Sequence, residues 1–541
     1  MAELSFKGRP ASTGFAAGPL CVLATTQVVA RAVGDAGAER AALRGAIDLA
    51  LADLAVLVAQ VSGDAADILG FQIAMLEDDT LSAPAFAAVE TGTAAHEAWH
   101  AALDIQIADY TAAEEEYFRA RAADLADLRD RVIRHLTGAA EVTAVAGAVL
   151  AAEDLTPSRF LSIDWSGGGA IALAKGSASS HVAMLARARG VPMVVGLGFE
   201  PAALRNDAAA IVNAVAGLLV VEPGADLRRD FDQAAAAAHA AEAVAAIYLK
   251  KPARLANGAP VAVMINVAGP EELATLDPAI CDGIGLVRTE FLFHGTAGLP
   301  DEEQQLGVYR RILDWAGDKP VTFRTLDAGG DKPIPGLTAD NEANPFLGLR
   351  GLRLSLARPE VFRVQLRALC RAAVKGNAKI MLPMVAVPRE LEAGRHLLDE
   401  VMMDLERRKI AAKRPPLGIM VEVPSAAIAV DHFDAAFFSI GSNDLTQYVM
   451  AAARDLDSVA ELSDAGDPAV LRLIAAVADY GRVAGREVSL CGDAGSDPAL
   501  VAKLLAAGLR ALSVAPPAVG RVKAAIARYW PESKRLELER P

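Results

Sequence analysis

The chain has 541 residues, which is too long for one compact core and predicts about three domains. Hydrophobic residues make up 53% of it and charged residues 22%, as in well-packed globular proteins, and the formal charge of −15 argues against a general nucleic-acid binder. No apolar run reaches transmembrane length, no signal peptide opens the chain, and the four cysteines lack metal-ligand spacing, so we expect reduced thiols in a cytoplasmic protein.

The first elements in chain order are a short strand and a long helical region. Gly14–Ala24 follows a Gly/Ser turn and is predicted to be a strand. Alanine, leucine and charged residues then recur with helical periodicity in four segments: Ala41–Val61, Ala65–Glu77, Ala94–Tyr110 and Ala112–Leu136. Asp79–Pro84 and Thr91–Thr93 are predicted to break these helices. We therefore expect residues 31–139 to form an inserted helical bundle.

One motif in this helical region matches a zinc-protease pattern. Residues 96–100 read HEAWH, in agreement with H-E-x-x-H, and on a helix His96 and His100 would share one face. The acidic run Glu114–Glu116 supplies candidate third ligands. Such a short pattern also arises by chance in helices of this composition, so a zinc protease is kept only as an alternative function.

After residue 142 the sequence returns to short apolar strands separated by turns. Strands are predicted at Ala148–Ala152, Ala170–Lys175, Val191–Val195, Asp207–Val212 and Gly217–Glu222. The isolated strand Gly14–Ala24 needs partners, which these strands supply. We therefore assign residues 1–30 and 140–224 to one α/β domain, with the helical bundle inserted between its two parts.

A small, flexible loop in this domain ends at His181. Residues 176–190 read GSASSHVAMLARARG, which is a Gly/Ser/Ala run followed by strong helix formers and by Gly190 as a C-cap. His181 is therefore predicted to begin a helix, where unpaired backbone N–H groups and the helix dipole favour an anion. A neutral imidazole nitrogen there can attack phosphorus, and the N–H groups can hold the transferred phosphoryl group. The competing interpretation is a capping or packed histidine.

The second half of the chain is predicted to be a barrel. Residues 225–255 are rich in alanine and predict a stiff linker helix, ended by the sequence KKP. From Pro260 onward eight apolar strands alternate with helices: Val261–Asn266, Gly283–Arg288, Val321–Leu326, Lys379–Pro383, Leu417–Val423, Ala436–Ile440, Glu487–Cys491 and Ala511–Val514. This order predicts a (β/α)8 TIM barrel over residues 256–541, with its site at the carboxyl ends of the strands.

Charged and polar residues recur at those strand ends. Arg288 ends the second strand, Arg324 lies near the end of the third, and Glu422 near the end of the fifth. Asp444 follows the sixth strand, and Cys491 ends the seventh. Two arginines can bind carboxylate and phosphate oxygens bidentately, and a glutamate with an aspartate suits Mg²⁺, which prefers oxygen ligands and substrate phosphate. The sequence thus predicts one site for a phosphate-bearing substrate and Mg²⁺.

Motifs along nearly the whole chain resemble enzyme I of the phosphoenolpyruvate-dependent phosphotransferase system. They are the His181 loop, DLTPS from Asp154, and then GIGLVRTEFLF, FRTLDAGGDK, NPFLGLR, GIMVEVPSA, SIGSNDLTQY and LCGDAG, in the order of that family. The loop departs from the family pattern at residues 177, 179 and 182, and Asp493 stands where the family usually has glutamate. Residues 114–134 resemble the helices that bind the phosphocarrier in that family.

The resemblance implies a multidomain α/β protein, in which an α/β phosphohistidine swivel domain carries the helical insertion and a TIM barrel follows. It also implies the role of each candidate residue: catalysis by His181 and Cys491, substrate binding by Arg288, Arg324, Asn443, Asp444 and Arg454, Mg²⁺ binding by Glu422 and Asp444, and completion of the phosphate environment by Lys332 and Arg350. Cys491 would protonate the enolate carbon, and the barrel would form a homodimer.

The predicted enzyme transfers the phosphoryl group of phosphoenolpyruvate to its own His181 with Mg²⁺ and releases pyruvate. It then passes the group to a histidine of a small HPr-like phosphocarrier protein, the first step of the phosphotransferase system. One alternative is an enzyme like pyruvate phosphate dikinase or phosphoenolpyruvate synthase without its nucleotide domain, for which this chain has no room. The others are the zinc protease and an inactive regulatory scaffold, and the sequence leaves the carrier and the pathway open.

Overall fold

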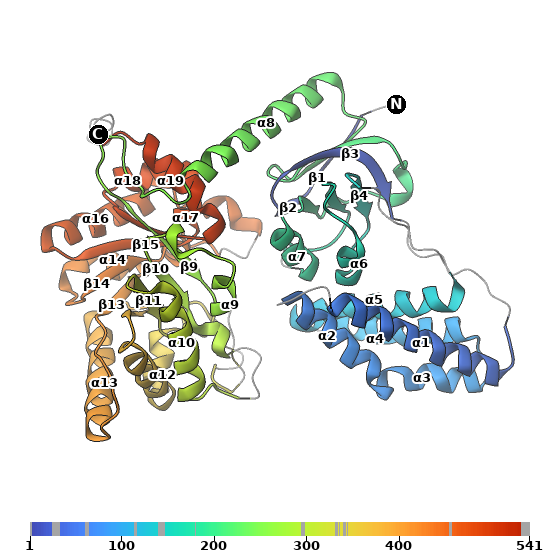
Figure 1. Ribbon diagram of the computed structural model, residues 1–541, viewed down its shortest axis with the longest axis horizontal. Coiled ribbons are helices and arrows are strands. Elements are labelled where there is room, and N and C mark those ends of the chain that lie inside the picture. The colour runs from blue at the N-terminus through green and yellow to red at the C-terminus, as the bar shows by residue number, and fades with distance from the viewer. Residues whose placement is uncertain are drawn as a thin grey trace. The chain divides into compact units, whose positions relative to one another are not determined.

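The computed structural model of the chain describes residues 3–23, 33–59, 64–112, 116–138, 146–178, 180–293, 298–330, 334, 336–338, 342, 344–453 and 457–531. The chain divides into two compact units, Met1–Ala238 and His239–Pro541 (Figure 1). No helix in the described ranges is long and apolar enough to cross a membrane.

The first unit contains a mixed sheet of eight strands. They lie in the order β1-β8-β7-β3-β4-β5-β6-β2, and their bounds are Leu4–Lys7 (β1), Arg9–Ser12 (β2), Phe15–Val22 (β3), Val149–Ala152 (β4), Ala170–Leu173 (β5), Met193–Val195 (β6), Ala209–Asn213 (β7) and Leu218–Val221 (β8). β3 to β6 run parallel, whereas the other pairings are antiparallel. The early strand β3 thus pairs with strands from much later in the chain, as its need for partners predicts.

Two of these strands, β1 and β2, do not follow from the sequence pattern. Each has only four residues, most side chains of β1 are exposed, and β2 contains Pro10. They lie at the two edges of the sheet, where β1 pairs with β8 and β2 with β6. An edge position tolerates a proline because one side of the strand needs no hydrogen-bonded partner.

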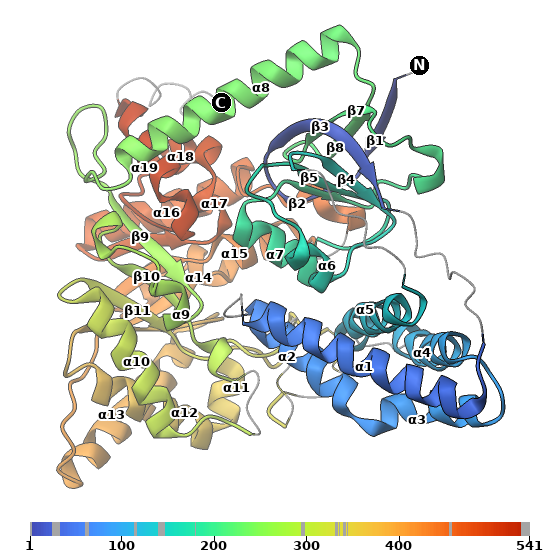
Figure 2. The same cartoon turned by 45° about the vertical axis from the view of Figure 1, so that its right-hand side comes forward.

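Both faces of the sheet are covered, which explains why its central strands are continuously apolar. Ala151 of β4 packs in one hydrophobic cluster, whereas its neighbours Leu150 and Ala152 pack in another. The second cluster includes residues of α6 (Pro157–Ser162), of α7 (His181–Arg189) and of the helical bundle (Figure 2). The helix that carries His181 is therefore fixed on one face of the sheet.

The helical bundle lies between β3 and β4 in the chain. Its helices are α1 (Ala36–Val58), α2 (Asp64–Glu77), α3 (Asp79–Glu90), α4 (Ala95–Ala112) and α5 (Glu116–Thr137). The predicted break at Asp79–Pro84 is wrong, because this segment begins α3. The Asp78 side chain caps α3 by accepting a hydrogen bond from the N–H of Thr80 at 2.9 Å, and one face of the helix is buried in the bundle. Capping and packing outweigh the cost of a proline inside the helix.

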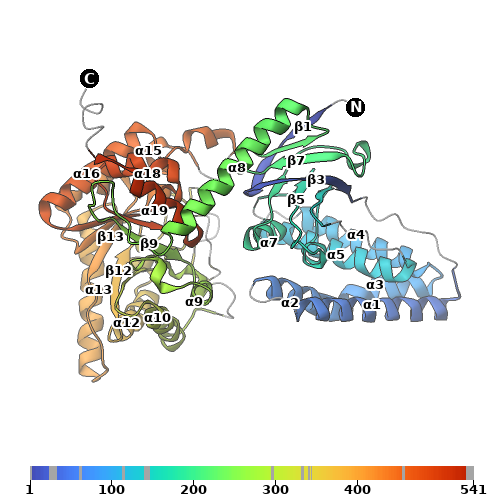
Figure 3. The same cartoon turned by 45° about the horizontal axis from the view of Figure 1, so that its top comes forward.

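The alanine-rich helix α8 (Ala225–Tyr248) contains the boundary between the two units. In the first unit its Phe231 packs against the sheet. In the second unit its Ala245 lies against α19 (Val519–Arg528), whose position in the barrel unit Figure 3 shows. A Cβ on Gly520 would lie 2.5 Å from the carbonyl oxygen of Ala245, so only glycine fits at this contact.

The second unit is a closed barrel of eight parallel strands, which confirms the predicted fold class. Its strands are β9 (Ala262–Val267), β10 (Ile284–Arg288), β11 (Pro320–Arg324), β12 (Asn377–Leu382), β13 (Leu417–Val421), β14 (Phe437–Ile440), β15 (Glu487–Cys491) and β16 (Ala511–Val514), and β16 closes the barrel by pairing with β9. Its helices after α8 are α9 (Pro270–Leu273), α10 (Glu302–Ala316), α11 (Leu352–Ala357), α12 (Pro359–Ala372), α13 (Pro388–Arg407), α14 (Pro424–Ile428), α15 (Ser442–Met450), α16 (Pro468–Ala484), α17 (Asp493–Ser496), α18 (Pro498–Ala506) and α19.

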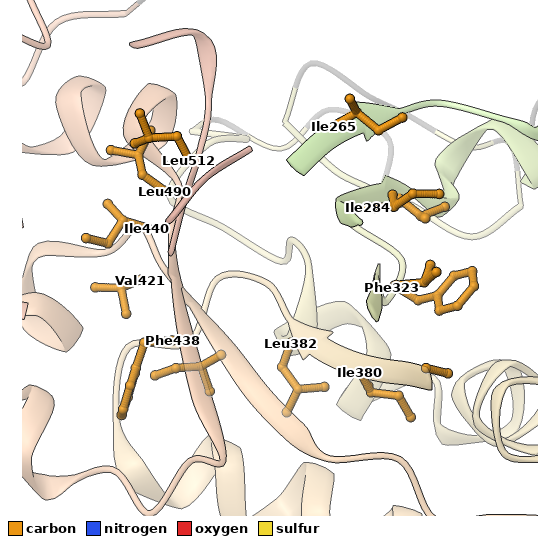
Figure 4. Packing of buried hydrophobic residues seen from close by; sticks show 14 of the residues in the cluster. Ile265, Ile284, Phe323, Ile380, Leu382, Val421, Phe438, Ile440, Leu490 and Leu512 are labelled. Carbon is orange, nitrogen blue, oxygen red and sulfur yellow. The ribbon is translucent and has the colours of Figure 1, made fainter. Parts of the chain in front are cut away.

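Neighbouring residues of a barrel strand pack in different clusters. Val287 packs in the large cluster between strands and helices, to which Phe323 and Ile380 in Figure 4 also belong. Leu286 packs instead in a small cluster that includes Cys491. Because all eight strands are parallel, their carboxyl ends share one end of the barrel, and side chains from different strands meet there.

Candidate active site

His181 is the first residue of α7. The preceding residue, Ser180, is the N-cap, and its Oγ accepts a hydrogen bond from the N–H of Ala183 at 3.2 Å. The helix ends at Gly190, which has the left-handed φ of 66° that the sequence predicts for a C-cap. His181 is partly exposed. Its side chain can therefore be reached from solvent at the helix end where backbone N–H groups favour an anion.

The loop before His181 is held by Arg187, which lies further along α7. Arg187 Nη1 donates to the carbonyl oxygen of Ala178 in the loop at 2.9 Å and to that of Ala11 in β2 at 2.7 Å. Asp154 lies close to the start of the loop, since its Oδ1 would be 3.6 Å from a Cβ on Gly176. Burial raises the pKa of this aspartate. The His181 loop is thus tied to the sheet through one guanidinium group.

At the carboxyl end of the barrel, Arg324 is buried between two carboxylates. Its guanidinium group lies 2.9 Å from Glu290 and 3.1 Å from Asp327. Burial by itself would lower the pKa of Arg324, but the neighbouring carboxylates outweigh this effect and raise it. Its Nε is buried and has no hydrogen-bond partner among the described residues. Arg324 is therefore charged, fixed in position and left with a donor that an anion can use.

Arg350 extends this network toward the sixth strand. The side chain is fully buried, and its Nε and Nη2 donate to the two carboxylate oxygens of Asp327, both at 3.0 Å. Its Nη1 donates to Asp444 at 3.0 Å. Carboxylates occupy both sides of the Arg350 guanidinium group. Its role is therefore to orient Asp444 and not to contact a substrate.

Glu422 is a buried carboxylate that lies near other acidic groups. Only 1% of the residue is exposed, and its Oε1 accepts a hydrogen bond from the N–H of Met384 at 2.6 Å. Burial, followed by repulsion from Asp444 and Asp327, raises the pKa of Glu422 to about 8. Oxygen donors that repel one another in a buried place suit a divalent cation, so Glu422 and Asp444 fit Mg²⁺.

Cys491 lies buried at the end of β15. Ser439 Oγ donates to its Sγ at 3.1 Å, and Ser489 Oγ donates in turn to Ser439 Oγ at 3.1 Å. Burial raises the pKa of Cys491 to about 11, although the Ser439 hydrogen bond and the charges of Arg324 and Arg288 act in the opposite direction. The thiol therefore keeps its proton at neutral pH and can serve as an acid.

Two of the remaining residues predicted to contact the substrate are described by the structure, and two are not. Arg288 is exposed and lies in register with Arg324 on the neighbouring strand. Asn443, at the start of α15, is partly exposed and bonds to Asp493. Arg454 and Lys332 lie outside the described residues. The barrel end thus brings together Arg288, Arg324, Glu422, Asn443, Asp444 and Cys491, whereas His181 belongs to the other unit.

The H-E-x-x-H motif lies on α4, but its two histidines are differently placed. His96 is buried within the bundle, and His100 Nδ1 lies 2.9 Å from Asp104. Among the described residues, no three or more His, Cys, Asp and Glu side chains form a group that could hold a metal. Glu114 and Glu115, two of the candidate third ligands, lie outside the described residues. The described part of α4 thus offers no assembled zinc site.

Sequence reasoning misses several partners in the barrel site. Glu290 and Asp327 occur in the motifs RTEF and FRTLD without an assigned role, and Ser439 is predicted only to be part of a strand. Glu290 and Asp327 follow the ends of barrel strands, and this position alone could have indicated that they belong to the site. No pattern in the sequence indicates that Ser439 bonds to Cys491, because the two residues are 52 positions apart.

Comparison with known families matches the chain in three consecutive parts. Residues 7–121 match the N-terminal domain of PEP-utilising enzymes, residues 144–217 their mobile domain, and residues 242–530 their PEP-binding domain, where PEP is phosphoenolpyruvate. These matches follow the order of the helical region, the His181 segment and the barrel.

Individual relatives agree with these domain matches. A phosphoenolpyruvate-protein phosphotransferase of Bacillus sp. (strain S) is 35% identical over 96% of this chain and 92% of its own length. The enzyme of that name from Geobacillus stearothermophilus has the same identity and coverage. A phosphoenolpyruvate-dependent phosphotransferase system protein of Escherichia coli (strain K12) is 33% identical over 85% of this chain and 62% of its own length. This chain therefore belongs to the phosphoenolpyruvate–protein phosphotransferases, the enzyme I family of the phosphotransferase system.

Proposed function

We propose that His181 takes the phosphoryl group of phosphoenolpyruvate at the carboxyl end of the barrel, releasing pyruvate, and then passes it to a histidine of a small HPr-like phosphocarrier. The observation that carries this proposal is the set of groups at the barrel end. Phosphoenolpyruvate presents a phosphate, a carboxylate and an enol carbon. The cationic Arg324 is matched in charge to the two anionic groups, the Glu422–Asp444 pair to the Mg²⁺ that would accompany them, and the protonated Cys491 to the enol carbon. Neither a dikinase without its nucleotide domain nor a zinc protease is favoured over this function.

Arg288 and Arg324 would bind the phosphate and carboxylate oxygens. Arg324 is already held by Glu290 and Asp327, so it does not need to reorganise when substrate binds. Phosphoryl transfer depends mainly on positioning and on stabilising charge, which fixed guanidinium groups provide. Asn443 and Arg454 would make further contacts with the substrate.

Glu422 and Asp444 would hold Mg²⁺, together with oxygens of the substrate. Only two carboxylates are proposed as ligands, and the described residues hold no larger group of metal-binding side chains. When bound, the ion would neutralise negative charge that develops on the phosphoryl and enolate oxygens. Burial, together with the neighbouring carboxylates of Asp444 and Asp327, raises the pKa of Glu422, and this excess of buried acidic groups supports a cation at this place.

Cys491 would donate the proton that converts the leaving enolate into pyruvate. Its high pKa keeps the thiol protonated until the basic enolate carbon forms, and the chain of Ser439 and Ser489 holds the sulfur in place. On His181, the N-terminus of α7 would stabilise the phosphoryl group through backbone N–H groups.

The division of labour along the chain follows from these roles. The α/β part (1–30 and 140–224) would carry the phosphohistidine, the insertion (31–139) would bind the carrier, and 225–255 would link them to the barrel (256–541). A homodimer through the barrel, a role in sugar transport and a cytoplasmic location belong to the same proposal, and the four cysteines without disulfides support the last of these.

The function is tested by incubating the chain with ³²P-labelled phosphoenolpyruvate, Mg²⁺ and candidate carriers, without nucleotide. We expect stoichiometric, acid-labile label on His181 and its transfer to one carrier. Label that requires a nucleotide would favour the dikinase-like alternative. Absence of any label on correctly folded protein would favour the regulatory scaffold.

A further inference from the structure

Asn443 and Asp493 make two reciprocal hydrogen bonds between neighbouring barrel segments. Asn443 Nδ2 donates to Asp493 Oδ2 at 2.9 Å, and the backbone N–H of Asp493 donates to Asn443 Oδ1 at 2.9 Å. Both polar ends of the amide are therefore held by one residue, which fixes its orientation. One hydrogen of Nδ2 is not used in this pair.

The surrounding backbone explains why the pair can form. Asp493 is the first residue of α17, so Asn443 Oδ1 accepts one of the N–H groups that a helix start leaves without an internal partner. A Cβ on the preceding Gly492 would lie 2.1 Å from Ser442 Oγ and 3.0 Å from Asn443 Oδ1. Glycine at this position therefore lets the two segments approach closely enough for the hydrogen bonds.

The pair also connects the two chemical functions of the site. Asn443 directly precedes Asp444, a proposed Mg²⁺ ligand, and Asp493 is two residues after Cys491, the proposed proton donor. The two segments lie at the ends of β14 and β15, which are neighbours in the barrel. A hydrogen-bonded pair at their carboxyl ends holds the metal-binding and proton-donating segments in register.

From this geometry we infer that Asp493 is a positioning residue for phosphoenolpyruvate, acting through the side-chain amide of Asn443. The inference rests on the proposed function and deepens it. With its oxygen and one hydrogen held by Asp493, the amide presents its remaining hydrogen in a single direction. Loss of the Asp493 carboxylate leaves the amide held only at its oxygen, by the backbone N–H of residue 493 and by Ser442 Oγ at 3.4 Å. Its nitrogen is then less restricted, so substrate binding has to restrict it.

A general effect of negative charge can be separated from the hydrogen bond by choice of substitution. Asp493→Asn removes the charge but keeps an oxygen that can accept from Asn443 Nδ2 and the same backbone N–H. Asp493→Ala removes both the charge and the acceptor. Asp497→Asn is the matched control. Asp497 lines the same surface pocket, and its substitution removes the same charge. Asp497 also caps α18, and asparagine can form the same cap.

The experiment measures steady-state phosphotransfer in the full chain and, independently, binding of phosphoenolpyruvate with Mg²⁺ by calorimetry to chains that also carry His181→Ala. For Asp493→Ala we expect a roughly tenfold loss in kcat/KM and in binding, mainly through KM, the size typical of one positioning hydrogen bond. Asp493→Asn should regain most of this loss, and Asp497→Asn should match the parent.

A double-substitution cycle decides whether Asp493 acts through Asn443. In the Asn443→Ala background, Asp493→Ala should cause no further loss. Additive losses, or equal losses for Asp493→Asn and Asp493→Ala, would overturn the inference. Failure of the proposed function is recognised separately, because the parent chain would then take no label, while the calorimetric comparison of the variants would still decide whether Asp493 orients a binding site.

Discussion

The two sites that the proposed reaction requires are built in different ways. Around His181 the structure provides a serine cap, one loop carbonyl held by Arg187 and the first turn of α7. At the barrel end, charged side chains are buried and paired, as in the contacts of Arg350 with Asp327 and Asp444. Stabilisation of charge is therefore concentrated in the barrel, whereas α7 contributes a nucleophile and backbone donors that can receive an anion.

The largest effect is expected from the simpler of the two sites. His181→Ala should abolish phosphorylation by phosphoenolpyruvate and leave the fold unchanged, because His181 is partly exposed and the Ser180 cap remains. Labelling and circular dichroism measure the two parts of this prediction. Stoichiometric acid-labile label on the variant would exclude His181 as the acceptor.

In the barrel, Cys491→Ala should separate phosphoryl transfer from protonation. Removing a general acid typically costs ~10²–10⁴-fold in the step that it serves. The variant should still form some phosphohistidine and release enolpyruvate that is protonated by water. With chirally labelled substrate in deuterated water, we expect a racemic methyl group from the variant and one face of protonation from the parent.

The control for that experiment is Cys370→Ala, which removes another buried thiol outside the site. It should keep protonation on one face. If Cys491→Ala also kept one face, another group would have to be the proton donor.

The paired charges of the barrel predict a large loss of stability when one is removed. Arg350→Met leaves the carboxylates of Asp327 and Asp444 without their shared partner and should lower the free energy of unfolding by about 3–5 kcal/mol. Arg482→Met, which breaks an exposed pair with Asp479, should change it by less than about 1 kcal/mol. Denaturant unfolding measures both, and equal stability of the two variants would contradict a structural role for Arg350.

The buried carboxylates of the barrel should also make stability depend on pH. The pKa of Glu422 is raised from 4.5 to about 8 in the folded chain. At a pH between these two values, the folded state therefore holds a proton on Glu422 that the unfolded state has already lost. Stability therefore falls as pH rises through this range. Without metal, Glu422→Gln should gain stability relative to the parent between pH 5 and 8, as unfolding by urea can measure. A parent and variant with parallel pH profiles would contradict the raised pKa.

The smallest effect is expected at the His181 loop. Arg187→Ala removes the donor to Ala178 and Ala11 and should slow phosphorylation of His181 about 3- to 10-fold by loosening the loop. Arg189→Ala is the control: it changes another arginine of α7, removes its cation–π contact with Phe160 of α6, and should leave the rate unchanged. Pre-steady-state labelling gives both rates, and equal rates would show that the loop needs no tether.

Much of the fold could be predicted because parallel strands covered on both faces are continuously apolar. This signal located all eight barrel strands and the central strands of the sheet. It failed at β1 and β2, which are edge strands of four residues without an apolar run. A different signal, the proline at position 84, wrongly predicted a break inside α3. In each case the deciding contribution was tertiary, either pairing with a distant strand or packing within the bundle.

In the candidate site, too, the features set by local sequence could be predicted and those set by tertiary contacts could not. Strand ends are visible in the sequence, so the pattern of apolar runs alone suffices to place Arg288, Arg324 and Glu422 together. The partners of those residues could not be predicted, because hydrogen bonds such as the pair of Asn443 and Asp493 join positions 50 residues apart. Which side chain holds another depends on barrel register, and no local pattern encodes that register.

Burial of Cys491 also affects how the protein withstands oxidants. Peroxides react with thiolates, and a thiol with a pKa of about 11 that is 3% exposed forms very little thiolate at neutral pH. Cys21, which is partly exposed, is the thiol expected to oxidise first. The same desolvation that keeps a proton available for the enolate therefore preserves the proton donor in a reduced state when exposed thiols are lost.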